Sequence, residues 1–237
     1  MTRSCRSVWL GRVGYAQGLE LQRELAKARQ EGRTGDVLLL LEHPPVITMG
    51  KISKDSNLRM EPAKYAALGI EIHQVDRGGD VTYHGPGQLV GYPIVALKEH
   101  RQDVKWYLER LEAVLIDALA AFGLTARRDP GFTGAWIGDR KIAAIGVRVE
   151  KWVTRHGFAL NVNTDLKAFD LIIPCGIQDR GVTSVRAELG HEVELAKVAA
   201  EVSRSFGRLF GYQVFHEAQA GQDGASPEAL LQAIAGR

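Results

Sequence analysis

Two amphipathic helical patterns enclose a long stretch of short β-like runs, and this mixture constrains the fold more than any other feature. From residue 104 to residue 122, apolar residues recur mostly at three- and four-residue steps, and Gly123 follows them. A second such pattern covers residues 195–209. Between the two lie short apolar runs at residues 134–137, 142–149 and 158–162, which are typical of strands.

The first hundred residues repeat the mixture without a regular alternation of strand and helix. Residues 15–30 favour a helix, and residues 36–42 favour a buried strand that His43-Pro44-Pro45 ends. We therefore predict an α+β fold, with a mixed and largely antiparallel sheet flanked by helices. One domain is expected over residues 1–216, and residues 217–237 are expected to form a loosely attached tail. That tail would carry a short helix, because Ser226-Pro227 fits an N-cap and first helical position.

Composition removes several classes of function. The formal net charge of the 237-residue chain is only +2, which argues against a nucleic-acid binder. No stretch approaches the roughly 18 apolar residues of a membrane span, and the first residues lack the apolar core of a secretory signal. Two cysteines cannot build a disulfide framework, so a cytoplasmic setting is expected. The seven histidines form no HExxH motif and CxxC is absent, so no metal or other cofactor is expected.

A glycine-rich segment, residues 77–88, carries side chains that are unusual for a plain turn. Its sequence is RGGDVTYHGPGQ, which matches neither of the common phosphate-binding glycine motifs. Glycines there fit either a tight hairpin or a loop that lets the backbone approach a ligand. Arg77, Asp80, Tyr83 and His84 favour the ligand-lining loop.

Cys175 and Lys141 are the candidate reactive pair. Cys175 lies between Pro174 and Gly176, at a bend after an apolar run. A lone cysteine is commonly an inert core residue, but its thiolate is a nucleophile when a cation lowers the thiol pKa. Lys141 enters an apolar strand from a turn, and a desolvated lysine there would both pair with a thiolate and accept a proton.

Three long motifs resemble the lipoyl(octanoyl) transferase family. They are RGGDVTYHGPGQLVGYPI at residues 77–94, DRKIAAIGVRVEKWVTRHGFALNVNTDL at 139–166 and IIPCGIQDRGVTSV at 172–185. The resemblance covers roughly residues 8–211 and implies a fold like that of biotin and lipoate protein ligases. It implies an acyltransferase that moves an octanoyl group from octanoyl-acyl carrier protein to a lysine of a lipoyl domain. The acceptors would be the lipoyl domains of 2-oxoacid dehydrogenase complexes and the glycine cleavage H protein.

The resemblance also implies roles for individual residues. Cys175 would carry the acyl thioester, and Lys141 would lower the pKa of its thiol and act as the base. The substrate-binding residues of the family correspond to Arg77, Gly78, Gly79, Asp80, Val81, Thr82, Tyr83, His84, Ala144, Ile145, Gly146, Gly157, Phe158 and Ala159.

Other functions remain open at this stage. An ATP-dependent lipoate or octanoate ligase of the same fold would activate a free acid, although the phosphate-cradling loop expected of biotin ligases is missing here. A non-catalytic carrier-binding module would gain no acyl group. A metal-dependent or cysteine hydrolase fits the residues least.

Overall fold

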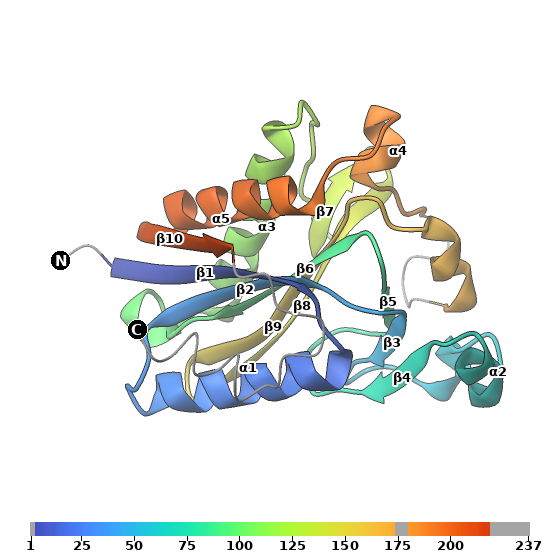
Figure 1. Cartoon of the computed structure of the whole chain (residues 1–237), viewed down its shortest axis with the longest axis horizontal. Coiled ribbons are helices and arrows are strands. Elements are labelled where there is room, and N and C mark those ends of the chain that lie inside the picture. Colours follow the sequence, from blue (N-terminus) through green and yellow to red (C-terminus); the bar gives the residue numbers. More distant parts are fainter. Residues whose placement is uncertain (1–2, 174–179, 219–237) are drawn as a thin grey trace.

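The computed structural model describes residues 3–173 and 180–218, and side chains as far as Gln213. A seven-stranded sheet in the order β10-β1-β2-β6-β9-β8-β7 runs through the described part of the chain (Figure 1). The pairs β10–β1 and β1–β2 are parallel, and the remaining neighbours are antiparallel. The strands are β1 (Arg3–Arg12), β2 (Asp36–Glu42), β6 (Gln88–Ile94), β7 (Gly134–Ile137), β8 (Arg140–Glu150), β9 (Val153–Asn161) and β10 (Tyr212–Ala218).

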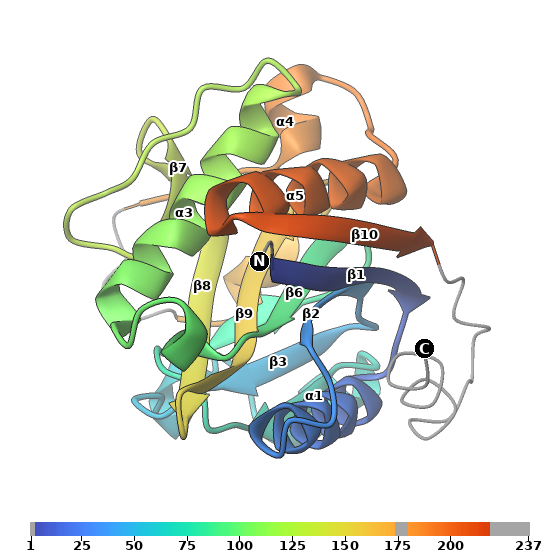
Figure 2. The same cartoon turned by 90° about the vertical axis from the view of Figure 1, so that its left-hand side faces the viewer.

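Helices cover both faces of this sheet (Figure 2). On one face lies α1 (Tyr15–Gln30), and on the other α3 (Val104–Ala120) crosses α5 (Leu195–Phe210). Each presents an apolar stripe to the sheet, so that Leu21 and Leu25 of α1 are fully buried on the first face. The short helices are α2 (Pro62–Ala67) and α4 (Val185–Leu189), and 3₁₀ turns occupy Asp55–Asn57, Leu97–Glu99 and Leu166–Leu171. Within the described residues, no helix is long and apolar enough to cross a membrane.

A second, three-stranded sheet stands at one end of the large one. Its order is β4-β3-β5, formed by β3 (Val46–Met49), β4 (Glu71–Gln74) and β5 (Thr82–His84). The chain leaves the large sheet at His43-Pro44-Pro45, where proline ends the hydrogen-bond ladder of β2. It returns through Gly85-Pro86-Gly87 into β6, and Gly87 adopts a φ of +80° that few other residues tolerate. Because β5 and β6 belong to different sheets, the glycine-rich segment is not a hairpin.

The predicted fold class is confirmed, and the limits of α1 and β2 agree with the prediction. The prediction for β9 began too late, because Thr154, Arg155 and His156 look like surface residues in the sequence yet are buried. The edge pair β1 and β10 was not predicted. The described chain ends at the close of β10, and the helix expected in the tail lies outside the described residues.

A buried charge cluster joins the parallel edge of the sheet to its neighbours. Asp36 on β2 accepts hydrogen bonds from Arg29 Nε at 2.7 Å, the Tyr212 hydroxyl at 2.6 Å and the Ala96 amide at 2.9 Å. Burial raises the pKa of Asp36, but hydrogen bonds from His100, Tyr212 and Arg29 outweigh it and lower the pKa to about 2. The ionised carboxylate therefore links α1, β2 and β10.

We expect Asp36→Asn to lower the free energy of unfolding by about 2–3 kcal/mol, because the buried Arg29 then keeps, among the described residues, only the carboxylate of Glu99, whose side chain is 44% exposed. Urea titration at pH 7 measures the change. The difference from the wild type should shrink as the pH falls through about 2, where Asp36 itself becomes protonated. Glu20→Gln is the control, because the Glu20–Arg23 pair is exposed and should contribute less than about 1 kcal/mol. An equal effect of both substitutions would contradict the assignment.

Candidate active site

A cavity of about 1050 Å³ has its walls on strands β8 and β9 and on the segment that leads into β5. All but one of the predicted site residues that the structure describes line it. These are Arg77, Gly78, Gly79, Asp80, Val81, Thr82, His84, Lys141, Ala144, Ile145, Gly146, Gly157, Phe158 and Ala159. The fold therefore brings together, around one cavity, residues that are up to about 80 positions apart in the chain and that were predicted to line a ligand.

Two rungs of the β8–β9 ladder consist of small residues, and the glycine rung lets neighbouring backbone approach the strands closely. Ala144 pairs with Ala159, and Gly146 pairs with Gly157. A Cβ on Gly146 would stand 2.9 Å from the carbonyl oxygen of Gly78, so only glycine permits this approach of loop and strand. The strands thus supply a backbone wall with few side chains, which suits a narrow apolar ligand.

Arg77 fixes the loop that forms the opposite wall. Its Nη2 donates to the carbonyl and to the hydroxyl of Thr48 on β3, both at 2.8 Å, and its Nη1 donates to the Gly78 carbonyl at 3.1 Å. Burial lowers the pKa of this guanidinium, although Arg remains charged at neutral pH. Arg77 is therefore both a lining residue and the anchor between the loop and the small sheet.

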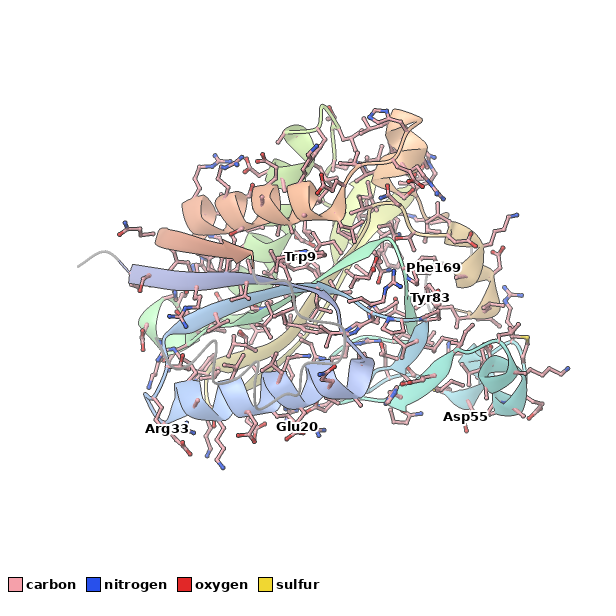
Figure 3. The ribbon with its side chains drawn as sticks, in the orientation of Figure 1. Trp9, Glu20, Arg33, Asp55, Tyr83 and Phe169 are labelled. Carbon is pink, nitrogen blue, oxygen red and sulfur yellow. The ribbon has the colours of Figure 1, made fainter. Side chains whose placement is uncertain are left out.

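Tyr83 is the exception among the predicted site residues, since it is not part of the described cavity lining. Its ring lies edge-on to Phe169 at 5.9 Å, and both are labelled in Figure 3. It belongs to the apolar cluster beneath the small sheet, together with Ile47 and Tyr65. Neighbouring residues in β5 point to opposite faces, which is why Thr82 and His84 reach the cavity while Tyr83 does not.

Lys141 lies near the start of β8 and faces the cavity. Its Nζ lies 4.8 Å from the centre of the buried Trp136 ring, and no ion pair of Lys141 occurs within the described residues. Burial lowers the pKa of Lys141 to about 8, although Asp129 and Glu112 partly oppose the shift. Near neutral pH this lysine can therefore exist in both protonation states, as a proton-transfer group must.

Cys175 lies outside the described residues, but both flanks of its segment are placed. The amide of Ile173 donates to the Asn57 carbonyl at 2.8 Å, and Ile173 lines the cavity. On the other flank, the amide of Lys141 donates to the Gly181 carbonyl at 3.0 Å, and the amide of Thr183 donates to the Lys141 carbonyl at 2.9 Å. The described residues on both sides of the 174–179 segment therefore lie at the cavity, and those on the second side lie beside Lys141.

The cavity also has polar lining residues that the sequence did not point to. Tyr15, Tyr92 and His156 contribute buried side chains from α1, β6 and β9. Burial lowers the pKa of His84 to about 3 and that of His156 to about 4, so both rings are neutral at pH 7. Tyr92 and His156 lie inside two of the motif segments but were not among the predicted site residues, and no local signal marks Tyr15. Which of these side chains reach the cavity depends on how α1 and the two sheets pack. Among residues 3–173 and 180–218, no group of three or more potential metal ligands occurs.

The other cysteine, Cys5, is 1% exposed in β1 and belongs to the core under α5. Burial raises the pKa of its thiol, which disfavours the reactive thiolate. Cys5 is therefore a structural residue.

Comparisons with known proteins identify the family. Residues 14–207 match the model of the lipoyl protein ligase A/B catalytic domain. The octanoyltransferase of Acidobacterium capsulatum is 52% identical over 220 residues, covering 86% of this chain and 89% of the relative. That of Rubrobacter xylanophilus is 52% identical over 203 residues, covering 85% and 91%.

The chain belongs to the lipoyl(octanoyl) transferase family. The predicted resemblance is thereby confirmed. A bipartite lipoate protein ligase from Thermoplasma acidophilum has the same fold, with a TM-score of 0.74 at 17% identity, covering 99% of this chain and 93% of that one. At this level of identity the likeness concerns the fold alone.

We expect Lys141→Met to raise the free energy of unfolding at pH 7 by about 1–3 kcal/mol, because the variant removes a poorly solvated charge. The wild type should recover as the pH rises from about 8 towards 10.5, where the folded protein has lost a proton that the unfolded chain retains. Urea titrations across this range measure the effect. Lys105→Met on the exposed side of α3 is the control and should show no such pH dependence. A destabilised Lys141→Met variant at pH 7 would contradict the burial argument.

Proposed function

We propose that this chain is an octanoyltransferase of protein lipoylation that carries the octanoyl group as a thioester on Cys175. Its relatives are named for octanoyl transfer. Two of them are 52% identical to this chain and cover 86% and 85% of it. The observation that carries the proposal is a partly buried lysine, with a pKa of about 8, that faces a cavity beside the two flanks of the Cys175 segment.

Chain connectivity supports the position of the thiol. Cys175 follows Ile173 by two residues, so their Cα atoms can be at most about 7 Å apart. Ile173 lines the same cavity as Lys141. In this proposal the Cys175 thiol lies at the same cavity and meets the ammonium group of Lys141, which would favour the thiolate.

The chemistry needs one proton carrier. The Cys175 thiolate attacks the carbonyl carbon of the donor thioester, the bond from carbon to the donor sulfur breaks, and Lys141 gives its proton to the leaving donor thiolate. The neutral amine of the acceptor lysine then attacks the acyl-enzyme. Neutral Lys141 takes the proton of that amine as the bond from carbon to the Cys175 sulfur breaks. Both residues return to their starting states, and the thioester supplies the activation that a ligase would take from ATP.

The cavity suits a medium-length acyl chain. Seven carbons follow the carbonyl of an octanoyl group, and burying them provides roughly 5 kcal/mol at about 0.8 kcal/mol per CH₂. The small side chains of Ala144 and Ala159, which line the cavity as one rung of the β8–β9 ladder, occupy little of it. Octanoyl-acyl carrier protein is the donor in this proposal. The acceptors are lipoyl domains of 2-oxoacid dehydrogenase complexes and the glycine cleavage H protein.

Intact-mass measurement tests the acyl-enzyme directly. After mixing with octanoyl-acyl carrier protein, the wild type should gain one octanoyl group that maps to Cys175, and Cys175→Ala should gain none. Cys5→Ser is the matched control and should still be acylated, because Cys5 is buried in the core. Modification of an acceptor domain with free octanoate and ATP, but without any acyl-enzyme, would favour a ligase instead. If neither condition produced an acylated protein, the result would support the alternative of a non-catalytic carrier-binding module.

The second half-reaction should follow the protonation of Lys141. With isolated acyl-enzyme and a lipoyl domain, two lysines must be neutral, Lys141 with a pKa of about 8 and the acceptor lysine with an ordinary pKa of about 10.4. We therefore expect the transfer rate to rise more steeply than tenfold per pH unit below pH 8 and by about tenfold per unit from pH 8 to pH 10, with an inflection near pH 8 that belongs to Lys141. Quenched-flow measurements from pH 6 to pH 10 give the profile. Lys141→Ala should be slower and should lack the inflection near pH 8. An unchanged profile in that variant would remove Lys141 from the role of base.

A further inference from the structure

The root of the loop that walls the cavity is tied to the middle of the large sheet by Asp76. Its Oδ2 accepts a hydrogen bond from Arg155 Nη2 at 2.6 Å, and its Oδ1 accepts one from His156 Nε2 at 2.9 Å. Arg155 and His156 are both buried in β9, and Asp76 directly precedes Arg77. None of these three residues contributes to the acyl chemistry described above.

The backbone of β9 is distorted at the point where it meets Asp76. His156 has a φ of +55°, a left-handed conformation that side chains other than glycine rarely adopt, although histidine is among the more tolerant residues. Its amide donates to Gln22 Oε1 of α1 at 2.7 Å. Such strain persists only where surrounding contacts enforce it, and it is common at functional sites.

His156 acts here as a hydrogen-bond donor and not as a charge. Burial lowers its pKa to about 4, so the ring is neutral at pH 7. Burial also raises the pKa of Asp76, but hydrogen bonds from His156 and Arg155 outweigh it and lower that pKa to about 2. The ionised carboxylate therefore selects the tautomer of His156 that carries its proton on Nε2.

The loop beyond Asp76 is held against strand β8 at its next residues. The amide of Gly78 donates to the Val147 carbonyl at 2.9 Å, and the Gly78 carbonyl lies close to the Cα of Gly146. Val147 is the residue paired with His156 across the β8–β9 ladder. The loop, the β8 wall and the Asp76 anchor thus meet around one rung of the sheet.

We propose that Asp76 and His156 are positioning residues that hold the 77–80 segment as a fixed wall of the cavity and so determine which acyl lengths are accepted. The inference rests on the proposed function, because it assigns the cavity to the acyl chain. Asp76 is bonded to two buried side chains of β9, so a wall fixed by it resists the displacement that a longer chain needs, whereas a loosened wall does not. Loss of the anchor should therefore change chain-length discrimination more than it changes the chemical step.

A pair of substitutions at His156 tests the hydrogen bond, with glutamine keeping most of the volume that the ring occupies in the cavity lining. Asparagine tolerates the left-handed backbone but is too short to reach Asp76, whereas glutamine places an amide donor near the position of Nε2. His156→Asn and His156→Gln are therefore compared with the wild type, and His191→Asn, at an exposed position, serves as the matched control. Thermal unfolding of each variant establishes that it is folded.

The donors are octanoyl and dodecanoyl thioesters of N-acetylcysteamine, which require no docking of a carrier protein. Acyl-enzyme formation is followed by intact mass, and the preference is the ratio of the two second-order rate constants. We expect the octanoyl preference to fall by about tenfold in His156→Asn, to return mostly in His156→Gln, and to stay unchanged in His191→Asn. The pH profile of iodoacetamide alkylation of Cys175 should be the same in all four proteins.

Two results would overturn the positioning role while leaving the proposed function intact. One is an unchanged octanoyl preference in a folded His156→Asn variant. The other is an equal loss of rate for both donors together with a shifted alkylation profile, which would place His156 in the chemical step. Absence of any acyl adduct in the wild type would instead overturn the proposed function, and this inference with it.

Discussion

Burial of one ammonium group is the constraint around which the site is organised. Lys141 is held beside the Trp136 ring because β7 and β8 pair there, and residues 181–183 cover it through backbone hydrogen bonds to its own amide and carbonyl. A solvated lysine would stay protonated and would be useless as a base near neutral pH. The low solvation that lowers its pKa costs stability, so the surrounding β-structure has to be firm enough to impose it.

The two sheets contribute different parts of the cavity. The large sheet supplies a wall with almost no side chains at the Ala144–Ala159 and Gly146–Gly157 rungs. The small sheet and the segment leading into it supply the polar anchors, of which Arg77 is the most extensively bonded. The prolines at positions 44 and 45 and the glycines at 85 and 87 allow the chain to pass from one sheet to the other and back.

Where the local pattern matched the burial, the sequence was enough to predict the element. The helix α1 and the strand β2 are recognisable because their residues follow the helical period and a continuous apolar run. The first half of β9 was not predictable in this way, since Thr154 is buried to bond Pro93 and Val95, and Arg155 is buried to bond Asp76. The parallel pairing of β1 with β10 joins segments about 200 residues apart, and no local pattern encodes such a contact.

The candidate site was predictable in outline because three motif segments carry most of its lining. Two of the motif segments contain Tyr92 and His156, but the sequence did not reveal that these side chains face the cavity, nor that Tyr15 of α1 joins them there. Those contacts exist only once α1 packs on the large sheet. Tyr83 illustrates the same limit in the other direction, since its neighbours in the motif reach the cavity and its own ring joins the apolar cluster with Phe169. Motif membership identified the segment, and strand geometry decided which side chains face the ligand.

The small sheet has its own apolar cluster, and this affects how it can move against the large sheet. Ile47, Tyr65 and Val81 pack among themselves and not with the cores on either face of the large sheet. The large sheet and the small sheet therefore have separate hydrophobic cores, and the cavity lies between the β8–β9 wall and the segment that leads into the small sheet. A hydrocarbon chain bound in the cavity would make apolar contacts with both parts, so the small sheet should move less against the large one in the acyl-enzyme than in the free enzyme.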